Sequence, residues 1–312
     1  MGTKILIGTA SWQEPDFIEY WYPRGLPKTK LLPYYAEHFN YVEVNGSFYG
    51  IPQAKTTAQW CKQTPEGFTF DVKLHRLLSR HSTEAKFLPP DLRSHADIAR
   101  GRVVLNAKIE KLVAEKFIAG IEPLIEAKKL GALLLQLSPS FSVKTNELSE
   151  LDHVLELFEA FPIAVELRNR YWLTDEQVAD TVVFFAKRKV TLVSVDAPPS
   201  SEHFTVMPCV DFVTNPKLAY FRLHGRNEEA YVKGRTVQER FDYDYSEEEL
   251  VDFAKRVSGM EKPVEAVHVV FNNNRHQYAP KAAEKFMEVA ARENKKFDVS
   301  RPRKKQPELI LG

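Results

Sequence analysis

Short apolar runs alternate with helical patterns along almost the whole chain, and this alternation limits the fold more than any other feature. Such runs, with the composition of buried strands, cover residues 4–8, 41–45, 68–74, 132–137, part of 161–172, 190–195, 219–225 and 266–273. Helical patterns cover residues 28–39, 54–63, 107–130, 145–160, 174–189, 246–257 and 279–294. Two of these helices begin with possible capping boxes, Thr174 with Gln177 and Ser246 with Glu249.

Strands that alternate with helices are usually parallel and joined by right-handed crossovers. Eight such units in about 295 residues fit a (β/α)8 TIM barrel better than an open doubly wound sheet. No GxGxxG or GxxxxGK[ST] motif opens a helix, so no nucleotide cofactor is expected. We therefore predict an α/β fold with one TIM-barrel domain over residues 1–294 and long loops after strands 3, 6 and 7. Residues 295–312 are predicted to form a basic, loosely ordered tail.

The composition is that of a soluble globular protein, with 44% hydrophobic and 27% charged residues in 312. The formal net charge is +1, which gives no global field to attract nucleic acid or a membrane. The first apolar run is too short for a signal peptide, and no run has the length of a membrane-spanning helix. Cys61 and Cys209 form neither a metal-ligand spacing nor a disulfide framework. Free thiols of this kind indicate a cytoplasmic protein.

Charged residues recur on one face of the predicted strands. In "FPIAVELRNRYW" (161–172), Glu166 and Arg168 interrupt an apolar run and, being two residues apart, point to the same side. The other strands show the same pattern towards their carboxyl ends. The polar positions are Glu43, Asn45, Asp71, Lys73, His75, Gln136, Ser138, Glu166, Arg168, Asp196, Arg222, His224 and Asn272. In a barrel this face lines the interior, and its carboxyl end is where barrel enzymes keep their chemistry.

Paired charges can also fill a barrel without any function, although they rarely stabilise it more than apolar residues do. A network of this size at the mouth favours a ligand or catalytic site. We predict that one cavity contains Glu43, Lys73, Glu166, Arg168, Asp196, Arg222 and His224.

Four residues are candidates for proton transfer: Glu43, Glu166, Asp196 and His224. A histidine such as His224 ordinarily titrates near neutral pH, although a structural, hydrogen-bonded role is the alternative. Arg168 and Arg222 have the geometry to clamp an anion, or else to hold the carboxylates in place. Lys73 is a candidate phosphate contact, a nucleophile if desolvated, or an ion-pair partner. The candidates for substrate binding are Trp12, Asn45, Tyr49, Lys73, Gln136, Arg168, Trp172, Arg222, Arg226 and Asn272.

Aromatic and basic residues are expected around the mouth. Trp12, Phe48, Tyr49, Trp172 and Tyr231 have the rings to stack on bases or sugars, or to close the barrel by packing. The loop 226–245 carries Arg226, Lys233, Arg235 and Arg240, where barrels often bind phosphate, although a solvated basic loop has the same composition. We expect this loop to contribute to the rim and to be more mobile than the barrel.

Seven short motifs occur in one order along the chain, and the resemblance that they carry spans roughly residues 4–290. They are "IGTASW", "VEVNGSFYGIP", "TPEGFTFDVK", "QLSPSF", "ELRNRYW", "FRLHGR" and "FNNN". In these motifs the chain resembles the YecE-like family, a TIM-barrel domain of unknown function (family 72). The resemblance implies a barrel like those of endonuclease IV and xylose isomerase, and by analogy phosphodiester or sugar chemistry. The segment after "FNN", "NRHQYAPKAA", is bulkier than the family pattern, so the ligand contacts of the last loop are not carried over.

A metal cluster of the endonuclease IV kind needs several histidines at strand ends, and this chain offers His224 with His75 and His268. The metal content is therefore left undecided, with one divalent cation held by carboxylates still open. Three functions stay open. The first is a hydrolase or lyase acting on a phosphate-bearing sugar or on nucleic acid. The second is a metal-free carbohydrate enzyme with two carboxylates. The third is a nucleic-acid-binding module without activity. The expected partner is an anionic small molecule or nucleic acid rather than a membrane, and the oligomeric state is left undecided.

Overall fold

The computed structural model describes residues 2–260 and 263–302, in which parallel strands form two five-stranded sheets. The first consists, in spatial order, of β12 (Phe297–Val299), β1 (Thr3–Thr9), β11 (Ala266–Phe271), β10 (Leu218–Leu223) and β9 (Ser194–Asp196). The second consists of β2 (Tyr41–Val44), β3 (Thr69–Lys73), β6 (Leu130–Gln136), β7 (Ile163–Glu166) and β8 (Thr191–Leu192). The predicted α/β class with parallel strands is confirmed.

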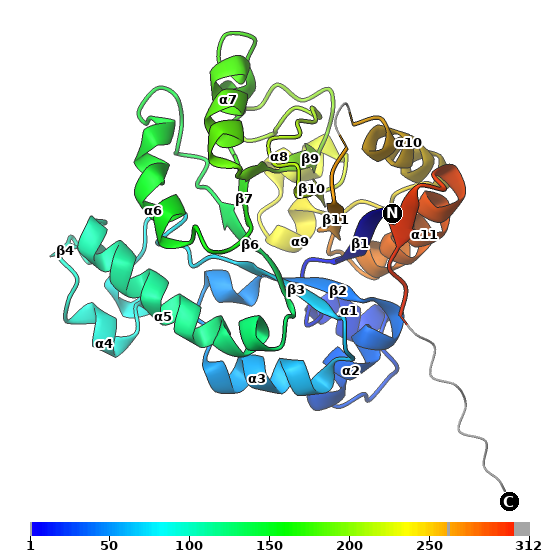
Figure 1. Ribbon diagram of the computed structural model, residues 1–312, viewed down its shortest axis with the longest axis horizontal. Helices are drawn as coiled ribbons and strands as arrows, with labels where there is room; N and C mark the ends of the chain where they lie inside the picture. Colours follow the sequence, from blue (N-terminus) through cyan, green and yellow to red (C-terminus); the bar gives the residue numbers. More distant parts are fainter. Residues whose placement is uncertain (1, 261–262, 303–312) are drawn as a thin grey trace, which may run out of the picture.

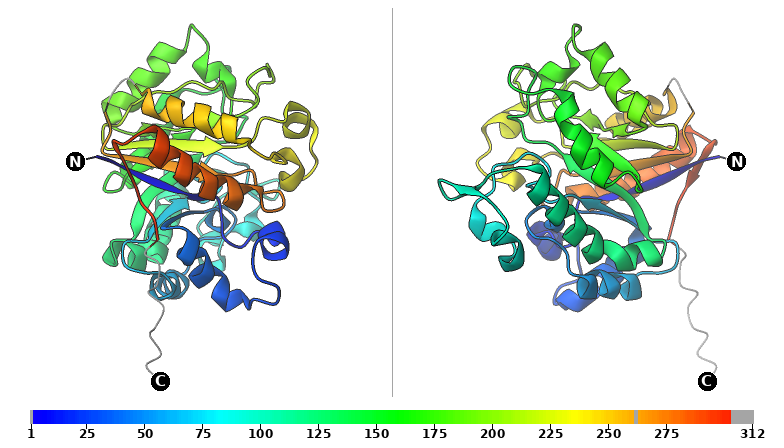
Figure 2. Two further views of the ribbon diagram at one scale, coloured as in Figure 1. Left: turned by 90° about the vertical axis from the view of Figure 1, so that its right-hand side faces the viewer. Right: turned by 60° about the vertical axis from the view of Figure 1, so that its left-hand side comes forward.

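Helices lie at the periphery and the strands in the middle (Figures 1 and 2). The helices that connect successive strands are α1 (Pro15–Tyr20), α2 (Lys28–His38), α3 (Ala54–Gln63), α5 (Ala107–Glu126), α6 (Asp152–Leu157), α7 (Val178–Arg188), α10 (Glu247–Ser258) and α11 (Tyr278–Glu293). The capping box of Ser246 and Glu249 at the start of α10 is confirmed. The one expected for Thr174 and Gln177 is wrong, because α7 begins only at Val178 and Gln177 is its N-cap without a side-chain hydrogen bond.

The three long loops are present, and those after β3 and β10 carry short elements of their own. The segment after β3 contains η2 (Ala85–Phe87), α4 (Pro90–Arg93) and the antiparallel pair β4 (Ile98–Ala99) and β5 (Arg102–Val103). The segment after β10 contains α8 (Glu228–Lys233) and α9 (Val237–Arg240). Further short turns of helix are η1 (Gly46–Phe48), η3 (Leu148–Leu151) and η4 (Arg170–Leu173).

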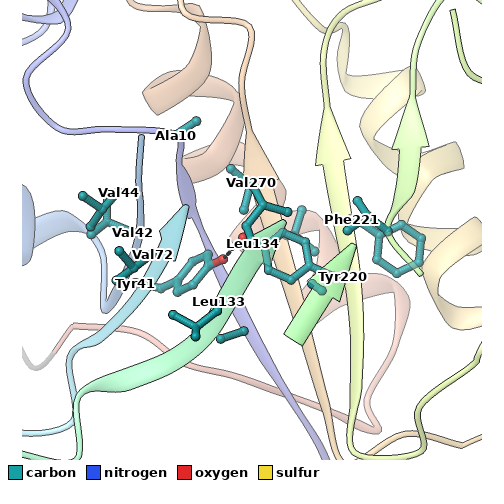
Figure 3. Close-up of a cluster of buried hydrophobic side chains, with 14 of the residues drawn as sticks. Ala10, Tyr41, Val42, Val44, Val72, Leu133, Leu134, Tyr220, Phe221 and Val270 are labelled. Carbon is teal, nitrogen blue, oxygen red and sulfur yellow. Dashed lines mark hydrogen bonds between the residues drawn. The ribbon is translucent and has the colours of Figure 1, made fainter. Parts of the chain in front are cut away.

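Alternate residues of each strand face the helices and the space between the sheets. On β10, Phe221 packs against Phe253 of α10, with ring centroids 5.6 Å apart. Its neighbour Tyr220 points the other way, and Figure 3 shows Tyr220 and Tyr41 directed towards one another from opposite sheets. On these strands, the side chains between the sheets therefore come from the same alternate positions as the polar residues Glu43 and Arg222.

A closed barrel is not confirmed, because the backbone ladders do not join the two sheets. Between β1 and β2 the hydroxyl of Tyr35, from α2, takes the place of ladder hydrogen bonds. It accepts from the Thr9 N–H at 2.9 Å and donates to the Tyr41 carbonyl at 3.1 Å. Glycine at position 8 permits this close approach, since a Cβ there would lie 2.2 Å from the Tyr41 carbonyl oxygen.

On the opposite side, β8 and β9 follow one another in the chain but pair with different sheets. Thr191 and Leu192 pair with β7, whereas Ser194 to Asp196 pair with β10. The sheets therefore meet at two seams, one bridged by Tyr35 and one made by the break between β8 and β9.

The tail prediction is partly wrong. Phe297 to Val299 form β12, which pairs with β1 in parallel, and the Ser300 N–H donates to the Ile5 carbonyl at 3.1 Å. The edge of the first sheet recruits this segment because β1 would otherwise leave backbone groups unpaired there. The rest of the predicted tail, residues 303–312, lies outside the described residues.

Candidate functional site

Arg222 is the centre of a buried polar cluster at the carboxyl ends of the strands. Its Nη2 and Nε donate to the two oxygens of Glu43 at 2.7 and 2.9 Å, and its Nη1 donates to Glu166 Oε2 at 2.5 Å. The exposed fraction of these three side chains is 1% or less. Burial alone raises the pKa of Glu166, but Arg222 and His224 outweigh it and hold this pKa well below its usual range. Glu166 is therefore ionised at neutral pH, and both carboxylates accept hydrogen bonds from Arg222.

His224 is held between two partners. Its Nε2 lies 3.2 Å from Glu166 Oε1, and its Nδ1 faces the amide nitrogen of Asn272 at 2.9 Å. With Asn272 donating, Nδ1 is the acceptor and Nε2 carries the proton. Burial lowers the pKa of His224 to about 4, although Glu166 opposes the shift. The expectation that His224 titrates near neutrality is wrong, because burial keeps the ring neutral there.

Lys73, at the end of β3, makes few polar contacts. Its Nζ donates to Gln136 Oε1 at 2.6 Å and lies 4.3 Å from the centre of the Phe48 ring. Gln136 in turn donates to Glu166 Oε2 at 2.9 Å. Burial, and after it the charge of Arg222, lower the pKa of Lys73 to about 7. An ion-pair role for Lys73 is not observed, since none of the described carboxylates lies within 4.0 Å of its Nζ.

Arg168 is the most exposed cation of the group, with 17% of its side chain accessible. Its Nε lies 3.6 Å from Glu166 Oε1 and has no hydrogen-bond partner among the described residues. Buried atoms without a partner there are also Tyr231 Oη and His81 Nδ1. We name the mouth cluster as Glu43, Lys73, Gln136, Glu166, Arg168, Arg222, His224 and Asn272.

The segment after β10 covers this cluster, as predicted for the rim. The rings of Tyr231, in α8, and Phe241 lie 6.2 and 5.2 Å from the ring of His224. Phe241 is stacked on that ring. The mobility expected for this segment stays a prediction.

A second polar group lies deeper between the sheets and is named the interior cluster: Tyr41, Asp71, Tyr220 and His268. Asp71 accepts from the Tyr41 hydroxyl at 2.5 Å and the Ala132 N–H at 2.7 Å, and it contacts His268 Nδ1 at 2.7 Å. The Tyr220 hydroxyl donates to Glu43 at 2.7 Å and so links the two clusters. No unpartnered buried nitrogen or oxygen occurs on these four side chains.

Asp196 does not belong to the mouth cluster, which corrects the prediction of one cavity. Its strand register places it beside Leu223, on the same face of β10 as Phe221, which packs against α10, while Arg222 lies beside Val195. Asp196 is bound there by Arg226 at 2.8 Å and Arg256 at 3.2 Å, and by the Tyr245 hydroxyl at 2.7 Å. Arg226 is thereby placed outside the mouth as well. Apolar residues on both faces of 190–195 made the facing of Asp196 ambiguous in the sequence.

The predicted aromatic contacts also lie elsewhere. Trp12 packs edge-on against Trp60 of α3 at 5.3 Å, and with Asn45 it lines a separate cavity of about 190 Å³. Trp172 stacks on Phe141 and donates to its carbonyl at 2.9 Å. Tyr49 is 63% exposed. The Trp172 ring is covered by Phe141, whereas the buried Trp12 Nε1 and Asn45 Oδ1 have no hydrogen-bond partner among the described residues.

The sequence pattern missed His81, whose ring lies edge-on to Phe48 at 4.9 Å, and Phe241, which stacks on His224. Both lie in long loops, where no strand periodicity indicates which way a side chain points. His75, expected at the strand end, is fully buried with its Nε2 unpartnered. Across the described ranges, no group of three or more His, Cys, Asp or Glu residues is arranged to hold a metal ion. Of the described helices, none is long and apolar enough to cross a membrane.

Comparison with known proteins places the chain in a family. The family model "Protein of unknown function DUF72" matches residues 6–308. UPF0759 protein YunF of Bacillus subtilis is 30% identical over 274 residues, which are 86% of this chain and 89% of YunF. UPF0759 protein YecE of Escherichia coli is 28% identical over 197 residues, 62% of this chain and 60% of YecE.

Two solved structures are similar over most of their length. A DUF72 family protein of Enterococcus faecalis has a TM-score of 0.74 at 28% identity, covering 92% of this chain and 95% of that one. A DUF72 family protein of Thermotoga maritima has a TM-score of 0.73 at 28% identity, covering 92% and 99%. The chain therefore belongs to the DUF72 family, the YecE-like family whose motifs its sequence carries.

Proposed function

We propose that the mouth cluster binds a phosphate-bearing sugar and that the protein is an enzyme of hydrolase or lyase type. The observation that carries this proposal is the pair Lys73 and Arg168 beside the mouth: Lys73 Nζ has one acceptor, and the buried Nε of Arg168 has no partner among the described residues. Buried donors without acceptors are costly, and a phosphate supplies several acceptors at once. Arg168 is the natural contact for the phosphate because it is the more exposed of the two.

We assign proton transfer to Lys73 rather than to the carboxylates of Glu43 and Glu166. Glu43 and Glu166 are both bound by Arg222, and the lowered pKa of Glu166 makes it a poor acid or base. Lys73, with a pKa of about 7, exchanges protons at neutral pH. This also disfavours a glycosidase with two carboxylates, which needs one protonated acid.

The proposal also includes the overall architecture of the sheets and the cellular location. We infer that the two sheets are halves of an eight-stranded barrel, supported by the Ser11 N–H bond to the Glu43 carbonyl at one seam and the continuous chain through β8 and β9 at the other. The free thiols of Cys61 and Cys209 support a place in the cytoplasm.

The test is calorimetric titration of the protein with inorganic phosphate, sugar phosphates and a short single-stranded oligonucleotide. We expect sugar phosphates to bind, to bind more weakly at high salt, and to lose affinity at least about tenfold in Arg168→Met. Arg188→Met is the matched control, because Arg188 pairs with Asp152 away from the mouth. Tight oligonucleotide binding without sugar-phosphate binding would instead favour the nucleic-acid module. Equal affinities in wild type and Arg168→Met would refute the proposal.

A further inference from the structure

Two buried lysines of this chain have opposite surroundings. Lys129 is 7% exposed, and its Nζ donates to three oxygens, those of the Cys61 and Thr64 carbonyls and the Thr64 hydroxyl, at 2.8 to 3.0 Å. Lys73 is 8% exposed, and its Nζ donates to one amide oxygen. An ammonium group has three donors, so Lys129 is saturated as a cation and Lys73 is not.

The surroundings of Lys73 suit a neutral amine. The nearby charges of Arg222 and Arg168 both disfavour protonation, while Glu43 and Glu166, which favour it, are bonded to Arg222. The Gln136 oxygen and the Phe48 ring hold Nζ in position at the carboxyl end of β3. A neutral amine held beside a phosphate-binding cation has the chemistry of a nucleophile for carbonyl groups.

We propose that Lys73 forms an imine with the open-chain carbonyl group of a sugar phosphate whose phosphate is held by Arg168. This rests on the proposed function and narrows its substrate class to phosphorylated aldehydes and ketones. The Nζ lone pair attacks the carbonyl carbon, and the C–N bond forms as the C=O π pair moves to oxygen. The oxygen then leaves as water, with the two protons that the amine carried, and a C=N bond remains. The imine nitrogen then takes up a proton from the solvent, and the protonated imine draws electrons from a neighbouring bond, which is lyase chemistry.

The pKa of about 7 supports this step. At about pH 7, half of Lys73 would be neutral, roughly a thousandfold more than an ordinary lysine. His224 is the imidazole of the mouth cluster, and its pKa of about 4 keeps it neutral at pH 7. The group of this cluster that titrates near pH 7 is therefore the amine of Lys73.

The experiment traps the imine by reduction. The wild-type protein is incubated with dihydroxyacetone phosphate or with uncharged dihydroxyacetone in the presence of sodium cyanoborohydride, and the modified lysines are mapped by mass spectrometry. Hydride from the reagent converts the C=N bond into a stable secondary amine. We expect Lys73 to be labelled at least about tenfold more than Lys129, with a rate that is half-maximal near pH 7.

Two variants test imine formation and phosphate binding independently. Lys73→Arg replaces the amine by a permanent cation that forms no imine, so this variant should bind sugar phosphates without being labelled at position 73. Arg168→Met should reduce labelling by the phosphate compound but not by the uncharged one. Binding by calorimetry without labelling at Lys73 would overturn the imine and leave the proposed function standing. Labelling at Lys73 that is equal for both probes, and insensitive to Arg168→Met, would support the amine and overturn the phosphate site. Absence of both binding and labelling would overturn both. Melting curves check that each variant is folded.

Discussion

The two polar clusters between the sheets differ in whether their hydrogen bonds are complete. In the interior cluster, Asp71 is surrounded by Tyr41, His268 and a backbone N–H, and no side-chain atom of the four is unpartnered. In the mouth cluster, Arg168 Nε lacks a partner and Lys73 has one acceptor. Buried polar groups are normally satisfied, so a complete network indicates scaffold and an incomplete one indicates a place for a ligand. Both clusters contain charged groups, so what distinguishes them is whether each polar atom has a hydrogen-bond partner.

Arg222 should show the largest effect, because it belongs to the mouth but has complete bonds. Arg222→Met leaves Glu43 and Glu166 buried without their cation and should lower the free energy of unfolding by about 3–5 kcal/mol. Arg188→Met, on the surface, should cost about 0–1 kcal/mol. Urea denaturation of both variants measures this. If Arg222→Met were as stable as Arg188→Met, the core of the mouth cluster would not be scaffold.

Gly131 tests whether the interior cluster is scaffold. A Cβ at this position of β6 would lie 2.4 Å from Asp71 Oδ1 and 3.1 Å from the His268 ring. Gly131→Ala should therefore displace this network and cost about 1–3 kcal/mol. Gly50→Ala is the control, since a Cβ there meets nothing within 4 Å. Sugar-phosphate binding by folded Gly131→Ala should be unchanged; a loss of binding would connect the interior cluster to the site.

Acid should destabilise the mouth through His224. Its folded pKa of about 4 lies below the ordinary value of 6.5, so the unfolded chain takes up the proton first as the pH falls. The stability due to the neutral ring is complete above about pH 6.5 and is lost towards pH 4. Between about pH 6.5 and 4.5 the loss should be about 2 kcal/mol, and His224→Gln should remove this part. Denaturation curves of the wild type and of His224→Gln at several pH values measure this loss. Identical dependence of stability on pH in the two proteins would contradict a buried neutral His224.

Arg168 should have the smallest effect on stability. It is partly exposed and lies 3.6 Å from a carboxylate that has other partners, so Arg168→Met should cost only about 0–1 kcal/mol. The same change should weaken the binding of a sugar phosphate at least about tenfold. Thermal melting and calorimetry on one sample distinguish the two properties. A large loss of stability with binding retained would class Arg168 with the interior cluster.

Strand periodicity predicted much of the fold and of this site. Alternation within β2, β7 and β10 placed Glu43, Glu166 and Arg222 between the sheets, because a strand's facing follows from residue parity. Parity did not determine the side of the sheet to which Asp196 points. Leu192 and Val193 are both apolar, so either face of that strand could be the buried one. The contacts of Trp12 and His81 depend on loop conformation, which has no period. The state of His224 depends on burial and partners far away in the sequence.

The position of β1 has a consequence for how the protein is made. Lys4 pairs with Ala266, and Thr3 with Phe297, so the first strand has its ladder partners near the end of the chain. At about 5–20 residues per second, a ribosome delivers β11 on the order of ten seconds to a minute after β1. The second sheet, from Tyr41 to Leu192, is complete long before. During synthesis, β1 therefore lacks its ladder partners β11 and β12 while all strands of the second sheet are already made. The hydroxyl of Tyr35 is a native hydrogen-bond partner of β1 that is available from the start of this period.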